Sequence, residues 1–222
     1  SFGPLTAKGV DERFDALSGH VVSCLEDIAP AYIERIGLQG GHLSTPEDTY
    51  RSRDDIPISY LCYNIEDSPL CYNRLLTNSD METELSEAIQ QSLPTCLQIQ
   101  KFKGRGVEMS TGVMSVSTDI GDDIVIVTVN LPITLRKGNE VVQEDTFSKR
   151  FEYPLGRLYD VSQDIIDVET QFGEFEQLSY MIAHKGQYII DKKKPYPDKL
   201  YILSSKDSAY LFQFFIQGEP LS

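Results

Sequence analysis

The sequence has few of the residues that metal centres and hydrolytic sites usually need. It contains no tryptophan, three histidines and four cysteines in 222 residues. No two cysteines have the C-x-x-C spacing, which argues against a zinc ribbon or a thioredoxin-type site. The H-E-x-x-H, G-x-S-x-G, Walker and dinucleotide-binding patterns are missing as well. These absences predict a chain without a bound metal, a cofactor or catalytic residues.

Long apolar runs are also missing. No segment approaches the roughly 18 to 20 apolar residues that span a membrane, and no signal peptide is recognisable. The chain starts abruptly at Ser1-Phe2-Gly3-Pro4. We therefore expect a mature or trimmed form whose targeting segment has been removed, with membrane contact only through an anchor that this sequence does not include.

Positive charge is scarce. Lys and Arg number 20 against 34 Asp and Glu, which gives a formal net charge of −14. Such a surface repels phosphate groups, so nucleic acid is not expected as a partner, and anionic lipid headgroups are disfavoured for the same reason. The only basic run, Lys192–Lys194, is typical of a solvated turn between two strands. The acidity suits solubility or a cationic partner.

The remaining composition is typical of a globular domain. Apolar residues make up 41% of the chain, with 12 Tyr and 10 Phe, and 222 residues are enough to bury a core. No change of composition marks a domain boundary. We predict a single extracytoplasmic domain over residues 1–222, with a helical part at 11–100 and a sheet-rich part at 107–222.

Two amphipathic helices are predicted in the helical part. Residues 11–36 and 80–100 both carry apolar side chains three and four positions apart, which gives each helix one buried stripe. Pro30 and Pro94 fall inside these segments and are expected to kink or divide the helices.

The four cysteines predict two disulfides, because an even count permits full pairing. Cys24 and Cys96 occupy similar places on the two helices: each precedes a leucine, and apolar residues lie three and seven positions before each. This parallel indicates an internal duplication or simply two similar helices, and it favours the pair Cys24–Cys96. Oxidised cysteines would place the protein outside the cytosol, and four reduced thiols are the alternative.

In residues 43–78 the apolar residues follow neither a helical nor a strand spacing, and the segment contains several prolines. We predict a long ordered loop there, with at most a short extended piece near Ile56–Tyr63. Cys62 and Cys71 flank a short polar stretch inside this loop, which could turn back and close. The second favoured disulfide is therefore Cys62–Cys71.

From residue 107 apolar residues recur at every second position, which predicts strands. Lys137–Glu140 is a favourable hairpin turn, because Gly138 and Asn139 tolerate a positive φ. A third helix is expected at 154–170. Helices packed on one face of an antiparallel β-meander, stapled by disulfides, define an α+β fold. The predicted strands are 107–109, 113–118, 124–135, 141–153, 187–190, 200–203 and 210–216.

The last predicted strand is almost entirely apolar. Such a strand is either buried or pairs with another chain, so it is a candidate interaction strand. Its apolar residues are Tyr210, Leu211, Phe212, Phe214, Phe215 and Ile216.

Among the three histidines, His42 is the best candidate for chemistry, because it follows two glycines that favour a surface turn. His20 is expected to be structural on the first helix, and His184 precedes a turn. The acidic turn Asp119–Asp123 could hold a structural cation, although a solvated hairpin tip is the favoured interpretation.

Short motifs resemble those of a known group of proteins. Val22–Leu25 followed by Ile36–Gly41 resembles a recurrent motif of uncharacterised membrane-anchored surface proteins of small-genome archaea. In these proteins a hydrophobic anchor precedes the motif, and a proline-aromatic stretch, a second Cys-Leu helix, a β-meander and a helix follow it. The resemblance implies a cell-surface location and this order of elements, without a mechanism. The matching pieces here are Ile56-Pro57 with Tyr60, Glu84–Leu97, Val107–Leu135 and Asn130–Ile133.

Disulfides, an acidic surface, an apolar last strand and the missing catalytic patterns together favour a non-catalytic cell-envelope domain. We expect it to bind a protein or cell-surface partner, or to self-assemble as adhesion and filament-forming domains do. One alternative is an envelope hydrolase that uses His42 with carboxylates of the 43–78 loop. The other is a ligand-binding sensor domain with a pocket between its helices and its sheet.

Overall fold

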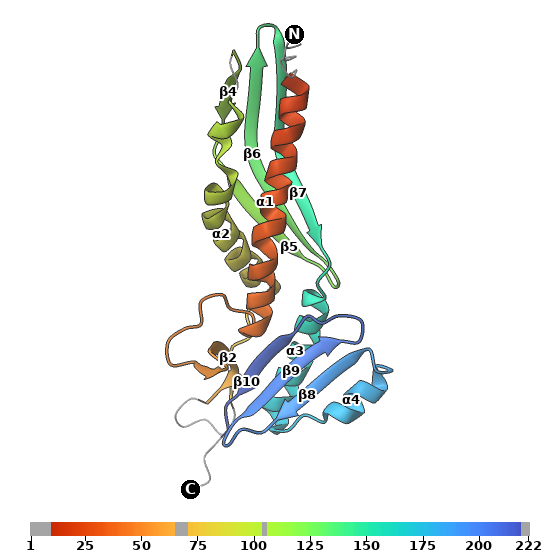
Figure 1. Cartoon of the computed structure of the whole chain (residues 1–222). Helices are drawn as coiled ribbons and strands as arrows, with labels where there is room; N and C mark the ends of the chain where they lie inside the picture. Colours follow the sequence, from red (N-terminus) through yellow and green to blue (C-terminus); the bar gives the residue numbers. More distant parts are fainter. Residues whose placement is uncertain (1–9, 65–70, 104–105, 219–222) are drawn as a thin grey trace.

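Helix α1 (Val10–Leu38) runs along most of the length of an elongated molecule (Figure 1). The computed structural model describes residues 10–64, 71–103 and 106–218. α1 is one helix of 29 residues that passes through Pro30 without a break. Fully buried side chains on both sides of the proline, such as Cys24 and Ile33, hold the helix in place. Their packing offsets the hydrogen bond that proline cannot make, so the helix is not divided there.

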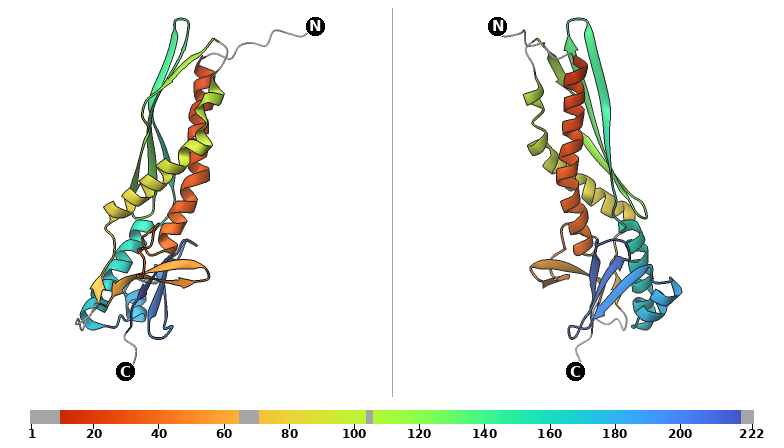
Figure 2. Two further views of the ribbon diagram at one scale, coloured as in Figure 1. Left: turned by 90° about the vertical axis from the view of Figure 1, so that its left-hand side faces the viewer. Right: turned by 45° about the vertical axis from the view of Figure 1, so that its right-hand side comes forward.

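One half of the molecule is a four-stranded antiparallel sheet covered on one face by two helices (Figure 2). Its elements are α2 (Asn78–Leu97), β4 (Glu108–Thr111), β5 (Ser115–Ile120), β6 (Val125–Lys137) and β7 (Glu140–Phe151). β4 and β5 follow one another along one edge of β6, and β7 pairs with its other edge. The predicted hairpin turn joins β6 to β7, with Gly138 at a φ of 61°. α1 and α2 are the two covering helices.

The other half is a six-stranded sheet with two helices, and its strands come from both ends of the chain (Figure 1). The elements are β1 (Tyr50–Arg53), β2 (Ile56–Tyr63), β3 (Tyr72–Asn73), α3 (Leu155–Phe172), α4 (Gln177–Ala183), β8 (Tyr188–Lys193), β9 (Lys199–Ser205) and β10 (Phe212–Ile216). The strand order is β1-β2-β10-β9-β8, with β3 beside β2. Every neighbouring pair is antiparallel except β2 and β10. α3 packs against one face, and α4 lies beside β8.

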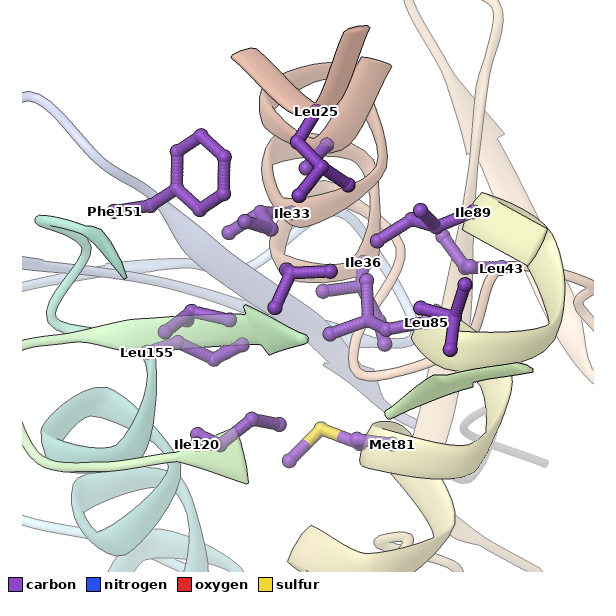
Figure 3. Packing of buried hydrophobic residues seen from close by; sticks show 14 of the residues in the cluster. Leu25, Ile33, Ile36, Leu43, Met81, Leu85, Ile89, Ile120, Phe151 and Leu155 are labelled. Carbon is purple, nitrogen blue, oxygen red and sulfur yellow. The ribbon is translucent and has the colours of Figure 1, made fainter. Parts of the chain in front are cut away.

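A continuous cluster of buried apolar residues connects the two halves (Figure 3). Ile33 and Ile36 from α1 meet Leu85 from α2 near the middle of this cluster. Leu155, at the start of α3, extends the same cluster toward the six-stranded sheet. Burial of apolar surface on both sides of the junction therefore stabilises the two halves as neighbours.

The α+β class, the antiparallel strands and the three long helices agree with the sequence predictions. β2 coincides with the extended piece predicted at Ile56–Tyr63. β1, β3 and α4 were not predicted, because elements of four, two and seven residues are too short to show a period. The division of the strands between two sheets depends on pairing between distant residues, which the local pattern does not reveal.

Candidate functional site

The glycine motif after α1 is a packing junction. Gly37 lies against the two residues that precede β10: a Cβ there would collide with the carbonyl oxygen of Leu211 and lie 2.5 Å from the hydroxyl oxygen of Tyr210. The Tyr210 hydroxyl donates a hydrogen bond of 2.8 Å to the carbonyl of Ile33. The Gln213 side chain donates one of 2.9 Å to the carbonyl of Leu38. The motif therefore fixes the end of α1 to β10. The close contact leaves no room for a Cβ, which explains the glycine at position 37.

His42 lies at the same junction and is only 8% exposed. Its Nδ1 is 3.6 Å from Oε1 of Glu84 in α2, and the other carboxylate oxygen accepts a 2.6 Å hydrogen bond from the Leu43 amide. Burial raises the pKa of Glu84, but the hydrogen bonds from His42 and Leu43 outweigh it and hold this pKa below its usual value. Within the described residues, the partner of His42 thus comes from α2 and not from the 43–78 loop that the hydrolase hypothesis requires.

Both predicted disulfides are present. Cys24–Cys96 joins α1 to α2 with 5.8 Å between the Cα atoms, and Cys62–Cys71 joins β2 to the residue before β3 with 5.2 Å between them. His20 lies beside the first bond, with Nε2 3.0 Å from the carbonyl oxygen of Leu97. His20, Cys24 and Cys96 place donor atoms within 4.8 Å of one another. Because the two sulfur atoms are bonded to each other, the oxidised protein offers no thiolates to a metal there.

β10 is a central strand, so the prediction that it is an interaction strand was wrong. Phe215 pairs with Tyr60 of β2 on one side and with Leu200 of β9 on the other. All five residues of β10 are buried. Its apolar character serves burial on both faces, which was the alternative left open by the sequence. Phe212–Ile216 therefore form an interior strand and not a sheet edge, while Tyr210 and Leu211 precede this strand.

A groove lies on the outer face of the six-stranded sheet, the face opposite α3. Phe214 and Phe215 are adjacent in β10 and point to opposite faces: Phe214 enters the main core, and Phe215 packs with Ile58 and Leu200 in a small separate cluster. Above this small cluster is a cavity of about 490 Å³. We call it the cationic groove; it is lined by Arg51, Ser52, Arg53, Lys193, Lys194, Pro195, Leu200 and Phe215.

The guanidinium group of Arg51 is held over the floor of the cationic groove. It lies 5.5 Å from the centre of the Phe215 ring and donates a 2.7 Å hydrogen bond to Asp198, whose side chain is 5% exposed. The Tyr60 hydroxyl donates to the same carboxylate at 2.7 Å. Burial is the largest cause that raises the pKa of Tyr60, and the neighbouring Asp198 carboxylate raises it further. This hydroxyl is therefore protonated and a donor at neutral pH. Arg51 is thereby held in place by Asp198 and by the Phe215 ring.

The other cationic side chains of the groove are held more loosely. Arg53 is 3.6 Å from Asp54, Lys193 is 3.4 Å from Asp191, and Lys194 is 3.2 Å from Glu174. These pairs involve exposed or half-exposed side chains, and pairs of that kind contribute about 0 to 1 kcal/mol each. The carboxylates paired with Arg53, Lys193 and Lys194 therefore hold these cations weakly.

A buried charge network supports the groove from the α3 side. Glu169, only 2% exposed, accepts a hydrogen bond of 2.7 Å from Lys199 and another from the Tyr201 hydroxyl. Lys192 donates a 2.6 Å hydrogen bond to Glu174, and its side chain is only 5% exposed. The prediction of a solvated turn at Lys192–Lys194 was wrong for Lys192 and Lys193, which belong to β8, and the Lys192 side chain is buried in this network.

Sequence reasoning missed the groove because its residues come from distant segments. Arg51 reaches the turn after β8, where its guanidinium donates a 3.2 Å hydrogen bond to the carbonyl of Pro195. Nothing local in the sequence relates β1 to that turn. The apolar run of β10, interrupted only by Gln213, was the available signal, since it required a covered outer face as well as a covered inner face.

The fold and the groove define a disulfide-stapled α+β domain with a cationic recess on an acidic surface. Comparison with models of protein families, with curated proteins and with solved structures finds no match for this chain. Among residues 10–64, 71–103 and 106–218, no helix combines the length and the apolar character needed to cross a membrane.

Proposed function

We propose that this chain is a non-catalytic domain of the cell envelope that binds an anionic partner through the cationic groove. The observation that carries the proposal is the groove itself: four cationic side chains surround an apolar floor in a chain of net charge −14. The two disulfides fit an oxidising location outside the cytosol. The resemblance of Val22–Leu25 and Ile36–Gly41 to archaeal surface proteins supports a place on the cell surface.

Local and net charge select different partners. At physiological ionic strength charges are screened beyond about 8 Å, so a small acidic group in the groove experiences the four cations and the carboxylates paired with them more than the rest of the acidic surface. A long polyanion would also cover acidic surface and be repelled. The sequence-based expectation of a cationic partner followed from net charge alone. The geometry supports a short acidic segment that carries an aromatic or aliphatic side chain for the floor at Phe215.

The test is the binding of a fluorescently labelled peptide of alternating Glu and Phe, followed by anisotropy. The double variant Arg53→Glu/Lys193→Glu removes two positive charges from the groove, and we expect it to reduce the affinity at least tenfold. The control Lys101→Glu/Arg136→Glu makes the same change of net charge on exposed residues of the other half. Equal loss in both variants, or no binding by the native chain, would contradict the proposal.

A second candidate is the sensor domain, and one observation favours it. A cavity of about 380 Å³ lies between α2 and β5. Thr118, which lines this cavity and is 8% exposed, has a buried Oγ1 without a hydrogen-bond partner in the described part of the chain. The isosteric Thr118→Val removes this hydroxyl. If neutral sugars raise the melting temperature of the native chain and not of the variant, the sensor function gains support; if neither responds, it loses its basis.

A further inference from the structure

The strand edges of the two sheets are protected to different degrees. Along β5, side chains of α2 occupy the edge: Gln90 accepts a 2.9 Å hydrogen bond from the Val116 amide, and Glu82 accepts one of 2.9 Å from the Ile120 amide. Beside β8, the Ile190 amide lies 3.3 Å from the sulfur of Met181 in α4. β1, β3 and β4 have only four, two and four residues. Short or covered edges such as these resist the addition of a further strand.

β7 is different, because it is long and only one of its edges is paired. It has 12 residues, and within the described ranges it is hydrogen-bonded in the sheet to β6 alone. A strand of this length spans about 40 Å. Phe147 and Phe151 are its only buried residues. α1 contacts β7 through side chains, including a 3.5 Å hydrogen bond from Ser18 to Glu144 and an ion pair between Glu26 and Lys149. These contacts lie between the helix and the sheet, since α1 covers a face of the sheet (Figure 2).

The charges along β7 are arranged in two halves. Glu140, Glu144 and Asp145 lie in the first half of the strand, and Lys149 and Arg150 lie in the second. When two such strands run antiparallel, the acidic half of each faces the basic half of the other. Opposite charges on neighbouring strands stabilise the pair, whereas like charges destabilise it. A parallel arrangement would place like charges together, so the pattern specifies one direction.

We propose that two copies of this chain associate through antiparallel pairing of their β7 strands. The contact is isologous, because the same edge is used on both copies around a two-fold axis. Main-chain hydrogen bonds supply the affinity, and the two charged halves set the direction and register. The net charge of −14 on each copy opposes the association, so a dimer of moderate affinity is expected. This inference is independent of the cationic groove, which lies on the other sheet.

Sedimentation of the whole chain at increasing concentration tests the pairing. An acidic-edge variant, Ser148→Glu/Arg150→Glu, makes β7 predominantly negative, and a basic-edge variant, Glu140→Lys/Asp145→Lys, makes it predominantly positive. We expect a concentration-dependent dimer for the native chain and a shift to monomer for each variant alone. An equimolar mixture of the two variants should form a dimer again, because each acidic segment then faces a basic one.

Circular dichroism of each variant separates a lost contact from a lost fold, since all four substituted positions are exposed. Amide hydrogen exchange gives a second readout: protection of β7 should rise with concentration in the native chain. A native chain that stays monomeric at the highest concentration would overturn the proposal. So would a dimer that both variants retain, or a mixture of variants that remains monomeric.

Discussion

The two faces of the six-stranded sheet are covered by different kinds of side chain. The inner face packs against α3 and belongs to the apolar core that unites the molecule, with Phe214 and Tyr201 stacked at 5.5 Å between ring centres. The outer face has the small cluster of Ile58, Leu200 and Phe215, and cationic side chains lie over it. The inner face therefore provides most of the buried apolar contact, while the outer face carries charged side chains that are exposed or half-exposed.

The largest effect is expected from two adjacent residues of β10. Phe214→Ala should lower the free energy of unfolding by about 4 kcal/mol, because it opens a cavity in the main core. Phe215→Ala opens a cavity in the smaller cluster and should cost about 3 kcal/mol, yet it should weaken binding of the acidic peptide more, since Arg51 loses its aromatic support. Urea denaturation and anisotropy measure the two quantities. Equal effects of both variants on affinity would remove the distinction between the faces.

The two disulfides allow a similar comparison. In the chain-entropy account, Cys24–Cys96 closes a 72-residue loop and stabilises by about 4 kcal/mol, while Cys62–Cys71 closes a 9-residue loop and stabilises by about 2.5 kcal/mol. Replacing each pair by serine should reproduce this order in urea denaturation. The serine variant of Cys24–Cys96 should retain its affinity for the acidic peptide under conditions where it is folded, because α1 and α2 lie outside the groove. Loss of that affinity would show that the groove depends on the other half of the molecule.

The junction between α1 and β10 can be tested with two glycines of the same helix. Gly37→Ala places a Cβ against the Leu211 carbonyl and the Tyr210 hydroxyl, and it should destabilise the protein by about 2 kcal/mol. Gly19→Ala has no atom within 4 Å of the added Cβ, so the better helix propensity of alanine should stabilise by about 0.5 to 1 kcal/mol. Thermal unfolding measures both. If both variants shifted the melting temperature in the same direction, the close packing at the junction would be contradicted.

A smaller effect concerns acid stability and involves Glu174, beside the groove. Burial raises the pKa of this carboxyl, but hydrogen bonds from Lys192, Lys199 and Lys194 outweigh it and lower the pKa from 4.5 to about 2. A depressed pKa in the folded state means that the stabilisation is present above pH 4.5 and is lost as the pH falls toward 2. Glu174→Gln should therefore be less stable at neutral pH and should show a flatter pH dependence in this range. Glu87→Gln, on the exposed side of α2, is the control.

Local patterns in the sequence determined much of the fold. The three long helices follow from apolar stripes, and the β6–β7 hairpin follows from the Gly138-Asn139 turn. The disulfide partners followed from the matching positions of Cys24 and Cys96. These features depend on residues near one another in the chain or on direct analogy between two segments.

Features that depend on distant pairing were not predicted. β10 was predicted to be a candidate interaction strand because its sequence is apolar. The sequence does not reveal which strands lie beside it, and its neighbours β2 and β9 make it a central strand. The cationic groove requires Arg51 and Lys193, which are far apart in the chain and meet only when the sheet forms. His42 was predicted to be at the surface, but packing of the glycine junction buries it beside Glu84.

The most direct test of the proposed recognition face is to locate the acidic peptide on the isotope-labelled protein by nuclear magnetic resonance. Saturating peptide should shift the signals of residues around the groove, with the largest changes at Arg51, Lys193 and Phe215. Signals of α1 and of the four-stranded sheet should remain unchanged. Shifts that concentrate on those elements, or that spread over the surface without a centre at the groove, would contradict the account.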